Sequence, residues 1–522
     1  MFYAPINAWS YRPAQSSASR QLWLVILTSF LFACQTAPSV EIPPSPENEA
    51  ELGTLILAND TRRIPVDAFN HTGEAAFIWP GGRRQEGSFV DGKLDGPGKE
   101  EFAGATYEGT WQNGVRHGSG TQEYADGGRF QGFWLEGLRS GLGNMRYADG
   151  STYSGDWVAD KRQGFGVLNG RRGSHYDGSW RADKRHGYGT EFHPNYVRYE
   201  GMWAAGKRHG FGLEIRPDGA TYRGEWIDDR REGSGIETYA MGAKHDGHWE
   251  ADRILGTGTR TTREGIELTG AWTLNVISSG LARFPDGNEY AGPLFKKKGT
   301  EVAPQFLAWL TARAGGSDGL PPSAYAQYLL ALAYLDFRLP ERDEAVAKIW
   351  LEASAAQDIQ DAHYRLALLL QNDNWQAAAP HLEAASTAKH PAATALLGEL
   401  YHTGQHYPQD LSKAVSLYET AIAEGHLSAR NNLAWLLATT ETELADPKRA
   451  AEMMRPLVMY LNNWQYLDTF AAAHARLGNF DMAVAMQERA VEDAKTTSPD
   501  HSALPEMQAR LELFRQSQAY RE

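Results

Sequence analysis

The chain has 522 residues, a hydrophobic fraction of 42% and a formal net charge of −14. This length accommodates several domains, and the composition is that of a folded protein. The acidic balance disfavours nucleic acid as a partner, because phosphate binding requires a basic footprint. Cys34 is the single cysteine, so a disulfide within the chain is excluded.

Residues 1–34 are typical of an export signal. Arg12 and Arg20 precede an apolar stretch, 22–33, that is too short to span a bilayer stably. The stretch ends in Leu-Phe-Ala-Cys, which resembles the lipobox of bacterial lipoproteins. That resemblance implies that Cys34 is diacylated, becomes the new N-terminus and anchors the protein to a membrane. The alternative is an ordinary secretory signal with an incidental cysteine, but the position of the one cysteine favours lipidation.

Residues 35–72 are predicted to form a tether and a lead-in, since 36–51 is rich in proline and polar residues. In lipoproteins of the family that the lipobox resembles, a residue other than aspartate after the cysteine implies delivery to the outer membrane. Gln35 holds that position. For a Gram-negative source, the expected location is therefore the cell envelope, on the outer membrane facing the periplasm.

Residues 73–295 repeat one phrase, an aromatic residue, then x-Gly-x-Trp, every 23 residues from YEGTW (107–111) to YRGEW (222–226). A period of this length indicates a tandem array. Alternation along a strand places ring, glycine and tryptophan on one face, and the glycine leaves room for neighbouring rings to cross the backbone. A glycine-rich turn and a second short strand complete a hairpin, which must stack on its neighbours to bury its aromatic face.

This phrase resembles the MORN-repeat family, whose pattern is Y-x-G-x-W-x-x-G-x-x-x-G-x-G. The match runs from about Gly87 to Gly292, and Phe77–Gly82 has the form of a degenerate leading unit. The resemblance implies an antiparallel ribbon of β-hairpins. Stacking places the repeat tryptophans in one column: Trp111, Trp134, Trp157, Trp180, Trp203, Trp226, Trp249 and Trp272.

Residues 296–322 are predicted to be a linker with a short helix near 304–313, and 323–518 follow helical periodicity. Small residues mark the expected helix crossings, at Ala326, Ala362, Ala392 and Ala429. Residues 393–429 resemble a Sel1-like repeat, and 431–490 resemble tetratricopeptide (TPR) repeats. The predicted fold class is therefore multidomain β + α, a MORN ribbon followed by an all-α Sel1/TPR solenoid of five helix pairs and a capping helix. The concave face of such an array is the expected site for a protein partner.

Each mid-repeat turn carries an arginine, which stacking would draw into one row: Arg116, Arg139, Arg162, Arg185, Arg208 and Arg231. Such a row could bind anionic lipid or an acidic glycan, and the MORN resemblance implies membrane contact for some members. The structural alternative is that these cations belong to the turn and protect a β edge. Acidic neighbours such as Asp160, Asp183, Asp228 and Asp229 partly cancel the row, and these mixed signs favour the structural alternative.

No catalytic motif, phosphate loop or metal motif is present, so the sequence predicts no enzyme, no catalytic residue, no cofactor and no metal site. His117, His186 and His209 share one repeat position, but neighbouring hairpins lie about 9.6 Å apart, too far to share a zinc ion. The sequence thus favours a non-catalytic, membrane-anchored scaffold of the bacterial envelope that binds a protein partner through its helical repeats. The alternative function is binding of anionic lipid or cell-wall or exopolysaccharide glycan along the basic row.

Overall fold

The computed structural model describes residues 52–66, 69–296, 301–317, 319–335, 342–461, 463–497 and 502–522. The chain divides into two compact units, one ending at Gly114 and one beginning at Val115. The described part of the first unit is an antiparallel sheet, and the second unit consists of an antiparallel β ribbon followed by helices. The order of a hairpin ribbon and then a helical array confirms the predicted fold class.

In the first unit, β1 pairs with both β2 and β3, and β3 to β6 pair in chain order. Phe77 is completely buried and stacks on Phe69 at 4.0 Å between ring centroids. The strands are β1 Leu52–Leu57, β2 Asp60–Pro65, β3 Gly73–Ile78, β4 Arg84–Val90, β5 Lys93–Phe102 and β6 Ala105–Gln112.

The sheet begins before residue 73, the predicted start of the array. Residues 52–65 form a hairpin, and Leu55 of its first strand lies opposite Phe77 of β3. This hairpin lacks the aromatic-x-Gly-x-Trp phrase, so the repeat pattern gives no sign of it. The leading unit expected at Phe77–Gly82 is confirmed as the end of β3 and a turn, in which the Gly82 amide donates to the Trp79 carbonyl.

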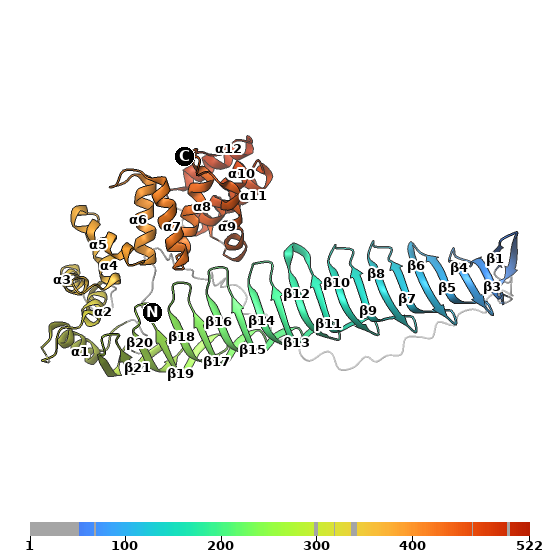
Figure 1. The fold of residues 1–522 in the computed structure, drawn as a ribbon, viewed down its shortest axis with the longest axis horizontal. Helices are drawn as coiled ribbons and strands as arrows, with labels where there is room; N and C mark the ends of the chain where they lie inside the picture. The colour runs from blue at the N-terminus through green and yellow to red at the C-terminus, as the bar shows by residue number, and fades with distance from the viewer. Residues whose placement is uncertain are drawn as a thin grey trace, which may run out of the picture. The chain divides into compact units, whose positions relative to one another are not determined.

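In the second unit, each strand from β7 to β22 pairs antiparallel with the next, and Figure 1 shows these strands side by side in chain order. The first eight are β7 Val115–Glu123, β8 Arg129–Leu135, β9 Leu138–Arg146, β10 Thr152–Val158, β11 Lys161–Asn169, β12 His175–Arg181, β13 Lys184–Phe192 and β14 Arg198–Ala204. The remaining eight are β15 Lys207–Ile215, β16 Thr221–Ile227, β17 Arg230–Thr238, β18 Lys244–Glu250, β19 Arg253–Thr261, β20 Glu267–Thr273, β21 Val276–Arg283 and β22 Glu289–Pro293.

Glycines lie opposite glycines across these strands, as in the pairs Gly155↔Gly166 and Gly166↔Gly178. A Cβ atom on Gly166 would lie 2.3 Å from the Tyr153 hydroxyl oxygen, a distance that no side chain can adopt without displacing the ring. The predicted role of these glycines, to let rings cross the backbone, is therefore confirmed.

The repeat rings form one buried seam within each unit. The Tyr153 ring meets Trp157 of its own hairpin edge-on at 5.2 Å and Trp180 of the next hairpin at 5.5 Å, both favourable quadrupole arrangements. The Trp180 indole N–H donates to the Gly166 carbonyl at 2.9 Å. All eight repeat tryptophans are at most 5% exposed, which confirms the predicted burial of the column.

The last hairpin is covered by α1, Pro304–Gly315. Phe306 lies 4.8 Å from Tyr290 and Trp309 lies 5.3 Å from Phe284, between ring centroids. Residues 296–322 were expected to be a linker, but the helix within them packs as a cap. Among the described residues no strand follows β22, so rings of the helix cover the aromatic face that another repeat would have covered.

In the described part of the chain, five helix pairs and a terminal helix follow α1, as predicted. Their bounds are α2 Ala324–Leu335, α3 Glu344–Ala355, α4 Gln360–Leu370, α5 Trp375–Thr387, α6 Pro391–Thr403, α7 Leu411–Ala423, α8 Leu427–Thr439, α9 Pro447–Tyr460, α10 Trp464–Arg476, α11 Phe480–Thr497 and α12 Leu504–Arg515. None of the described helices combines the length and the apolar character needed to cross a membrane.

Small residues allow these helices to approach one another. A Cβ atom on Gly398 of α6 would lie 3.0 Å from the ring of Tyr418 on α7, so the close contact depends on glycine. Ala326, Ala362 and Ala429 are completely buried, as the sequence indicates. In the third pair the buried residue is Ala393, whereas the predicted Ala392 is half-buried, because the helix turns the following position toward its neighbour.

Candidate functional site

The six predicted arginines occupy equivalent positions near the start of the second strand of successive hairpins. Arg162 shows the common arrangement. Its backbone N–H and its Nε both donate to Oδ1 of Asp183, at 3.0 and 3.1 Å, and its Nη2 donates to the Asp183 carbonyl at 3.0 Å. The Asp183 amide in turn donates to the Arg162 carbonyl at 3.1 Å. We call this four-bond arrangement the clasp.

The clasp recurs wherever aspartate stands 21 residues after the arginine, in the pairs Arg139–Asp160, Arg162–Asp183, Arg208–Asp229 and Arg231–Asp252. Each aspartate is the second residue of the turn that joins the two strands of the next hairpin, with φ near +70°, a left-handed conformation that aspartate tolerates better than most residues. The clasp therefore joins one hairpin to the next.

Each clasped guanidinium also stacks on a tryptophan. The Arg162 Cζ lies 4.2 Å from the Trp180 ring centroid, and Arg208 lies 4.0 Å from Trp226. Stacking of this kind stabilises a cation over an electron-rich ring. The clasped arginine side chains are only 19–22% exposed, because the ring covers one side and the aspartate another.

Two arginines of the row lack the aspartate. Gly137 follows Arg116 by 21 residues, and Arg116 stacks more loosely, with its Cζ 5.4 Å from Trp134. Gly206 follows Arg185, whose Nη2 donates to the Gly206 carbonyl at 2.9 Å and whose Nη1 pairs with Glu191. Arg185 still lies 4.0 Å from the ring of Trp203.

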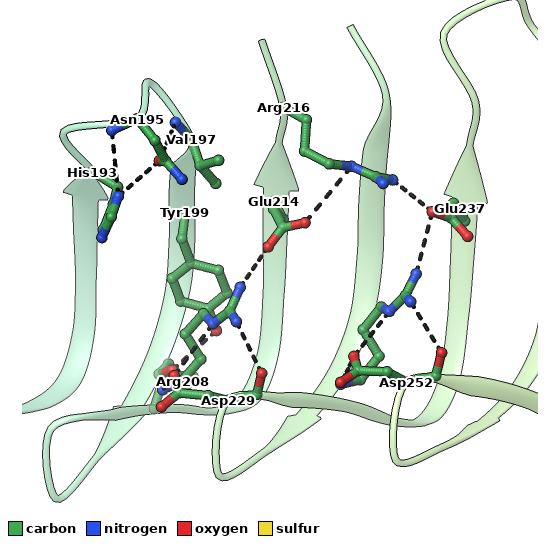
Figure 2. Close-up of polar contacts among 12 residues, drawn as sticks. His193, Asn195, Val197, Tyr199, Arg208, Glu214, Arg216, Asp229, Glu237 and Asp252 are labelled. Atoms are coloured by element: carbon green, nitrogen blue, oxygen red, sulfur yellow. Dashed lines mark hydrogen bonds and ion pairs between the residues drawn. The ribbon is translucent and has the colours of Figure 1, made fainter. Parts of the chain in front are cut away.

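Toward the C-terminal end of the row, the arginines join a longer ion network (Figure 2). Glu214 pairs with Arg208 and lies 3.7 Å from Arg216, whose Nη2 donates to Glu237 at 2.6 Å. Glu237 also receives Arg231 at 3.2 Å and is 5% exposed. Burial alone would lower the pKa of Arg216, but the hydrogen bond from Arg216 to Glu237 and the nearby carboxylates outweigh it and raise the pKa, so the guanidinium stays charged.

These contacts favour the structural alternative for the arginine row, because the guanidinium groups neutralise carboxylates of the ribbon itself. Anion binding by Arg116, Arg139, Arg162, Arg185, Arg208 and Arg231 stays a prediction. Four of the arginines are immediately preceded by a cation that faces solvent: Lys161, Lys184, Lys207 and Arg230. Sequence reasoning had noted Asp160, Asp183 and Asp229 as charge cancelling; the recurring offset of 21 residues is the signal that identifies them as partners.

Other predicted groups fall elsewhere. Cys34, the predicted lipidation site, lies outside the described residues. Among those that the structure describes, no group of histidine, cysteine, aspartate and glutamate side chains could hold a metal ion.

The helical array contains a surface hollow of about 750 Å³ between the α6–α7 and α8–α9 connections. Lys413 lies above the Tyr401 ring, with its Nζ 4.0 Å from the ring centroid and 2.6 Å from the hydroxyl oxygen. Asp410 caps α7 at one wall, and Thr442, Glu443 and Leu444 form the opposite wall. A volume of this size can receive one or two side chains of a peptide.

The fold and these surfaces define a tandem-repeat protein that contains two kinds of repeat: β-hairpins, which form a ribbon, and helix pairs, which form an array. The ribbon is an array of MORN repeats: the family model matches seven, at residues 86–104, 107–129, 130–152, 153–175, 176–198, 199–221 and 222–244. No curated protein matches the chain.

Among solved structures, the chain is similar to a Sel1 repeat protein from Oxalobacter formigenes, at 16% identity and a TM-score of 0.30, over 37% of this chain and 86% of that one. It is also similar to c5321, a protective antigen of uropathogenic Escherichia coli strains that displays an SLR fold. That likeness has 18% identity and a TM-score of 0.32, and it covers 41% of this chain and 45% of the other.

Proposed function

We propose that this protein is a non-catalytic scaffold of the bacterial envelope, anchored through a lipid at Cys34, and that its helical repeats bind a protein partner. The observation that carries the binding role is the hollow beside Tyr401 and Lys413, where an exposed cation lies over an aromatic ring at the edge of two helix pairs. Repeat arrays present extended surfaces of this kind to partners. The anchor and the outer-membrane location rest on the N-terminal sequence alone.

Site-specific photo-crosslinking in the native envelope tests the binding role. A photoreactive residue at position 413 is expected to capture a discrete partner, and Lys413→Glu is expected to abolish its co-purification. The matched control is position 495, where Lys495 is exposed near the end of α11, away from the hollow. Equal capture from both positions, or a partner retained in full by Lys413→Glu, contradicts the proposal.

A second candidate function is contact between the ribbon and anionic lipid or glycan. Exposure of Lys161, Lys184 and Lys207 supports it, since these side chains are not held in the clasps. Vesicles containing anionic lipid, and cell-wall sacculi, should then bind the native protein, and this binding should weaken as the salt concentration rises. The triple variant Lys161→Glu/Lys184→Glu/Lys207→Glu should not bind to either. The arginine reversals Arg162→Glu, Arg185→Glu and Arg208→Glu would confuse lost binding with lost structure, so the lysine triple variant is the cleaner test.

A further inference from the structure

A column of turn residues in the ribbon lacks a side chain at one repeat. The residue directly after the second strand of a hairpin begins the turn to the next hairpin. After β7, β9, β11, β13, β15 and β17 these residues recur every 23 positions: Tyr124, Tyr147, Gly170, His193, Arg216 and Tyr239. Tyr124 and Tyr147 are half-buried, and burial raises the pKa of both phenols. Gly170 has no side chain to place there, and a short 3-10 turn, Arg171–Gly173, follows it.

A hollow of about 310 Å³ lies at this repeat. The charges that act on the Tyr147 hydroxyl belong to Arg162, Arg139 and Asp183. One period later the equivalent positions are Arg185, Arg162 and Gly206, and all three line the hollow. The hollow therefore lies where a tyrosine ring would lie if residue 170 were a tyrosine, as residues 124, 147 and 239 are. Its other walls include Tyr176, Trp180 and Leu168, and the carboxylates of Asp183 and Glu191, which pair with Arg162 and Arg185.

The same repeat also lacks its carboxylate. In the four clasps, the arginine N–H and Nε converge on one aspartate oxygen. Gly206 takes the place of that aspartate beside Arg185, and the bonds described for Arg185 use only its two Nη atoms. Gly206 adopts φ +92°, in the left-handed region where the clasp aspartates lie at +66 to +71°. The arginine donors and the turn backbone are thus arranged as in a clasp, but no aspartate carboxylate is there to accept from them.

We infer that the hollow beside Arg185 and Gly206 is a binding site for an aromatic carboxylate. The ligand's ring takes the place of the missing tyrosine ring against Tyr176 and Trp180, and its carboxylate accepts from the N–H and Nε of Arg185 as the clasp aspartates do. Lys184 is exposed, lines the hollow and adds positive charge. A free aromatic acid and a peptide ending in tyrosine or phenylalanine both carry this chemistry.

The test uses the full-length protein and 4-hydroxyphenylacetate as the probe, in ligand-observed NMR and isothermal titration calorimetry. A dissociation constant of about 1 mM is expected for a ligand of this size. 4-Methylphenol, which lacks the carboxylate, should bind at least tenfold more weakly. The peptide Gly-Gly-Gly-Tyr and its C-terminal amide distinguish the two sources: tighter binding of the free-acid peptide than of 4-hydroxyphenylacetate indicates a protein C-terminus, and the reverse order a small acid.

Gly206→Asp is the decisive variant, because it supplies the carboxylate that the repeat lacks. It should weaken binding at least tenfold while leaving the thermal midpoint unchanged or higher, so lost binding cannot be ascribed to unfolding. Gly137→Asp is the control, since Gly137 also lies 21 residues after an arginine of the row, Arg116, but does not line the hollow. Binding that survives Gly206→Asp, that is lost equally in Gly137→Asp, or that is undetectable in the native protein overturns the inference.

Discussion

The guanidinium of Arg208 lies 4.0 Å above the ring of Trp226, although the two residues belong to different hairpins. The same arginine bonds to Asp229 in the turn that follows Trp226. A stack and a clasp thus act together at the four clasped junctions, where they couple one hairpin to the next. This is the pattern expected of an array whose stability is a sum of local terms.

Replacing that arginine by lysine should be costly despite the conserved charge. Lysine cannot stack as a planar group and does not hold its donors in the fixed fork that lets a guanidinium bond to the aspartate oxygen and carbonyl together. We expect Arg208→Lys to lower the free energy of unfolding by about 1–2 kcal/mol in urea titration. Arg230→Lys, at the exposed first residue of β17, is the control and should have no measurable effect. Equal behaviour of the two variants would show that the clasp contributes nothing.

The buried seam makes a larger contribution. Trp180→Ala should lower the free energy of unfolding by about 3–5 kcal/mol, because it leaves a cavity between Tyr153 and Tyr176. Phe165→Ala, on the neighbouring strand and 71% exposed, should change it by less than about 0.5 kcal/mol. Circular dichroism during denaturant titration measures both, and a small effect at Trp180 would refute the shared seam.

Two glycines separate the steric role from the conformational one. Gly166→Ala should cost about 3 kcal/mol, because its Cβ would meet the Tyr153 hydroxyl at 2.3 Å. Gly150→Ala meets nothing within 4 Å but adopts φ +85°, so it should cost only about 1 kcal/mol. The order of the two thermal midpoints checks the prediction, and a reversed order would contradict it.

The ring column contains a pH-sensitive position. His245 replaces the usual tyrosine, is completely buried, and burial together with Arg260 lowers its pKa to about 4. The unfolded chain therefore binds a proton at higher pH than the folded chain does, so stability falls as pH drops from about 6.5 toward 4.

The expected loss attributable to His245 between pH 7 and pH 4.5 is about 2 kcal/mol. His245→Tyr restores the repeat residue and should remove that share, while Lys244→Tyr, exposed beside it, should not. Urea titrations at the two pH values give the comparison. A native protein and a His245→Tyr variant with parallel pH profiles would rule out this histidine as the source.

Lipidation at Cys34 gives a prediction independent of the repeats. Cys34→Ala should abolish incorporation of labelled palmitate and move the protein from the membrane fraction to the soluble fraction. Cys34→Ser is a second variant that keeps the size of the side chain. Continued labelling of either variant would exclude the expected anchor.

Much of the ribbon could be predicted because its information repeats. Tyr153, Gly155 and Trp157 specify one hairpin face, and the same three residue types return every 23 positions, so one correct interpretation applies to the whole array. The capping helix was harder to predict, since Phe306 and Trp309 carry no repeat signature and only the exposed last hairpin explains them. The β1–β2 hairpin was missed for a similar reason.

The candidate sites were less accessible from sequence. The arginine row was visible, but whether its charge faces solvent or Asp183 depends on where the turn of the next hairpin lies, which spacing alone did not establish. The hollow at Gly170 arises from two missing side chains in different repeats. Only the register of the strands, which brings Gly206 next to Arg185, shows that the side chains missing at Gly170 and Gly206 would both lie near the same arginine.

Because each clasp links an arginine to an aspartate 21 positions later, the four clasped junctions of the ribbon use the same parts. A segment of 23 residues could be removed or duplicated between two such junctions, and the cut surfaces would still match. The length of the ribbon can therefore change in steps of one repeat without requiring a new interface between hairpins. Such a change would preserve the surfaces at the two ends while altering only how far apart along the chain they are held.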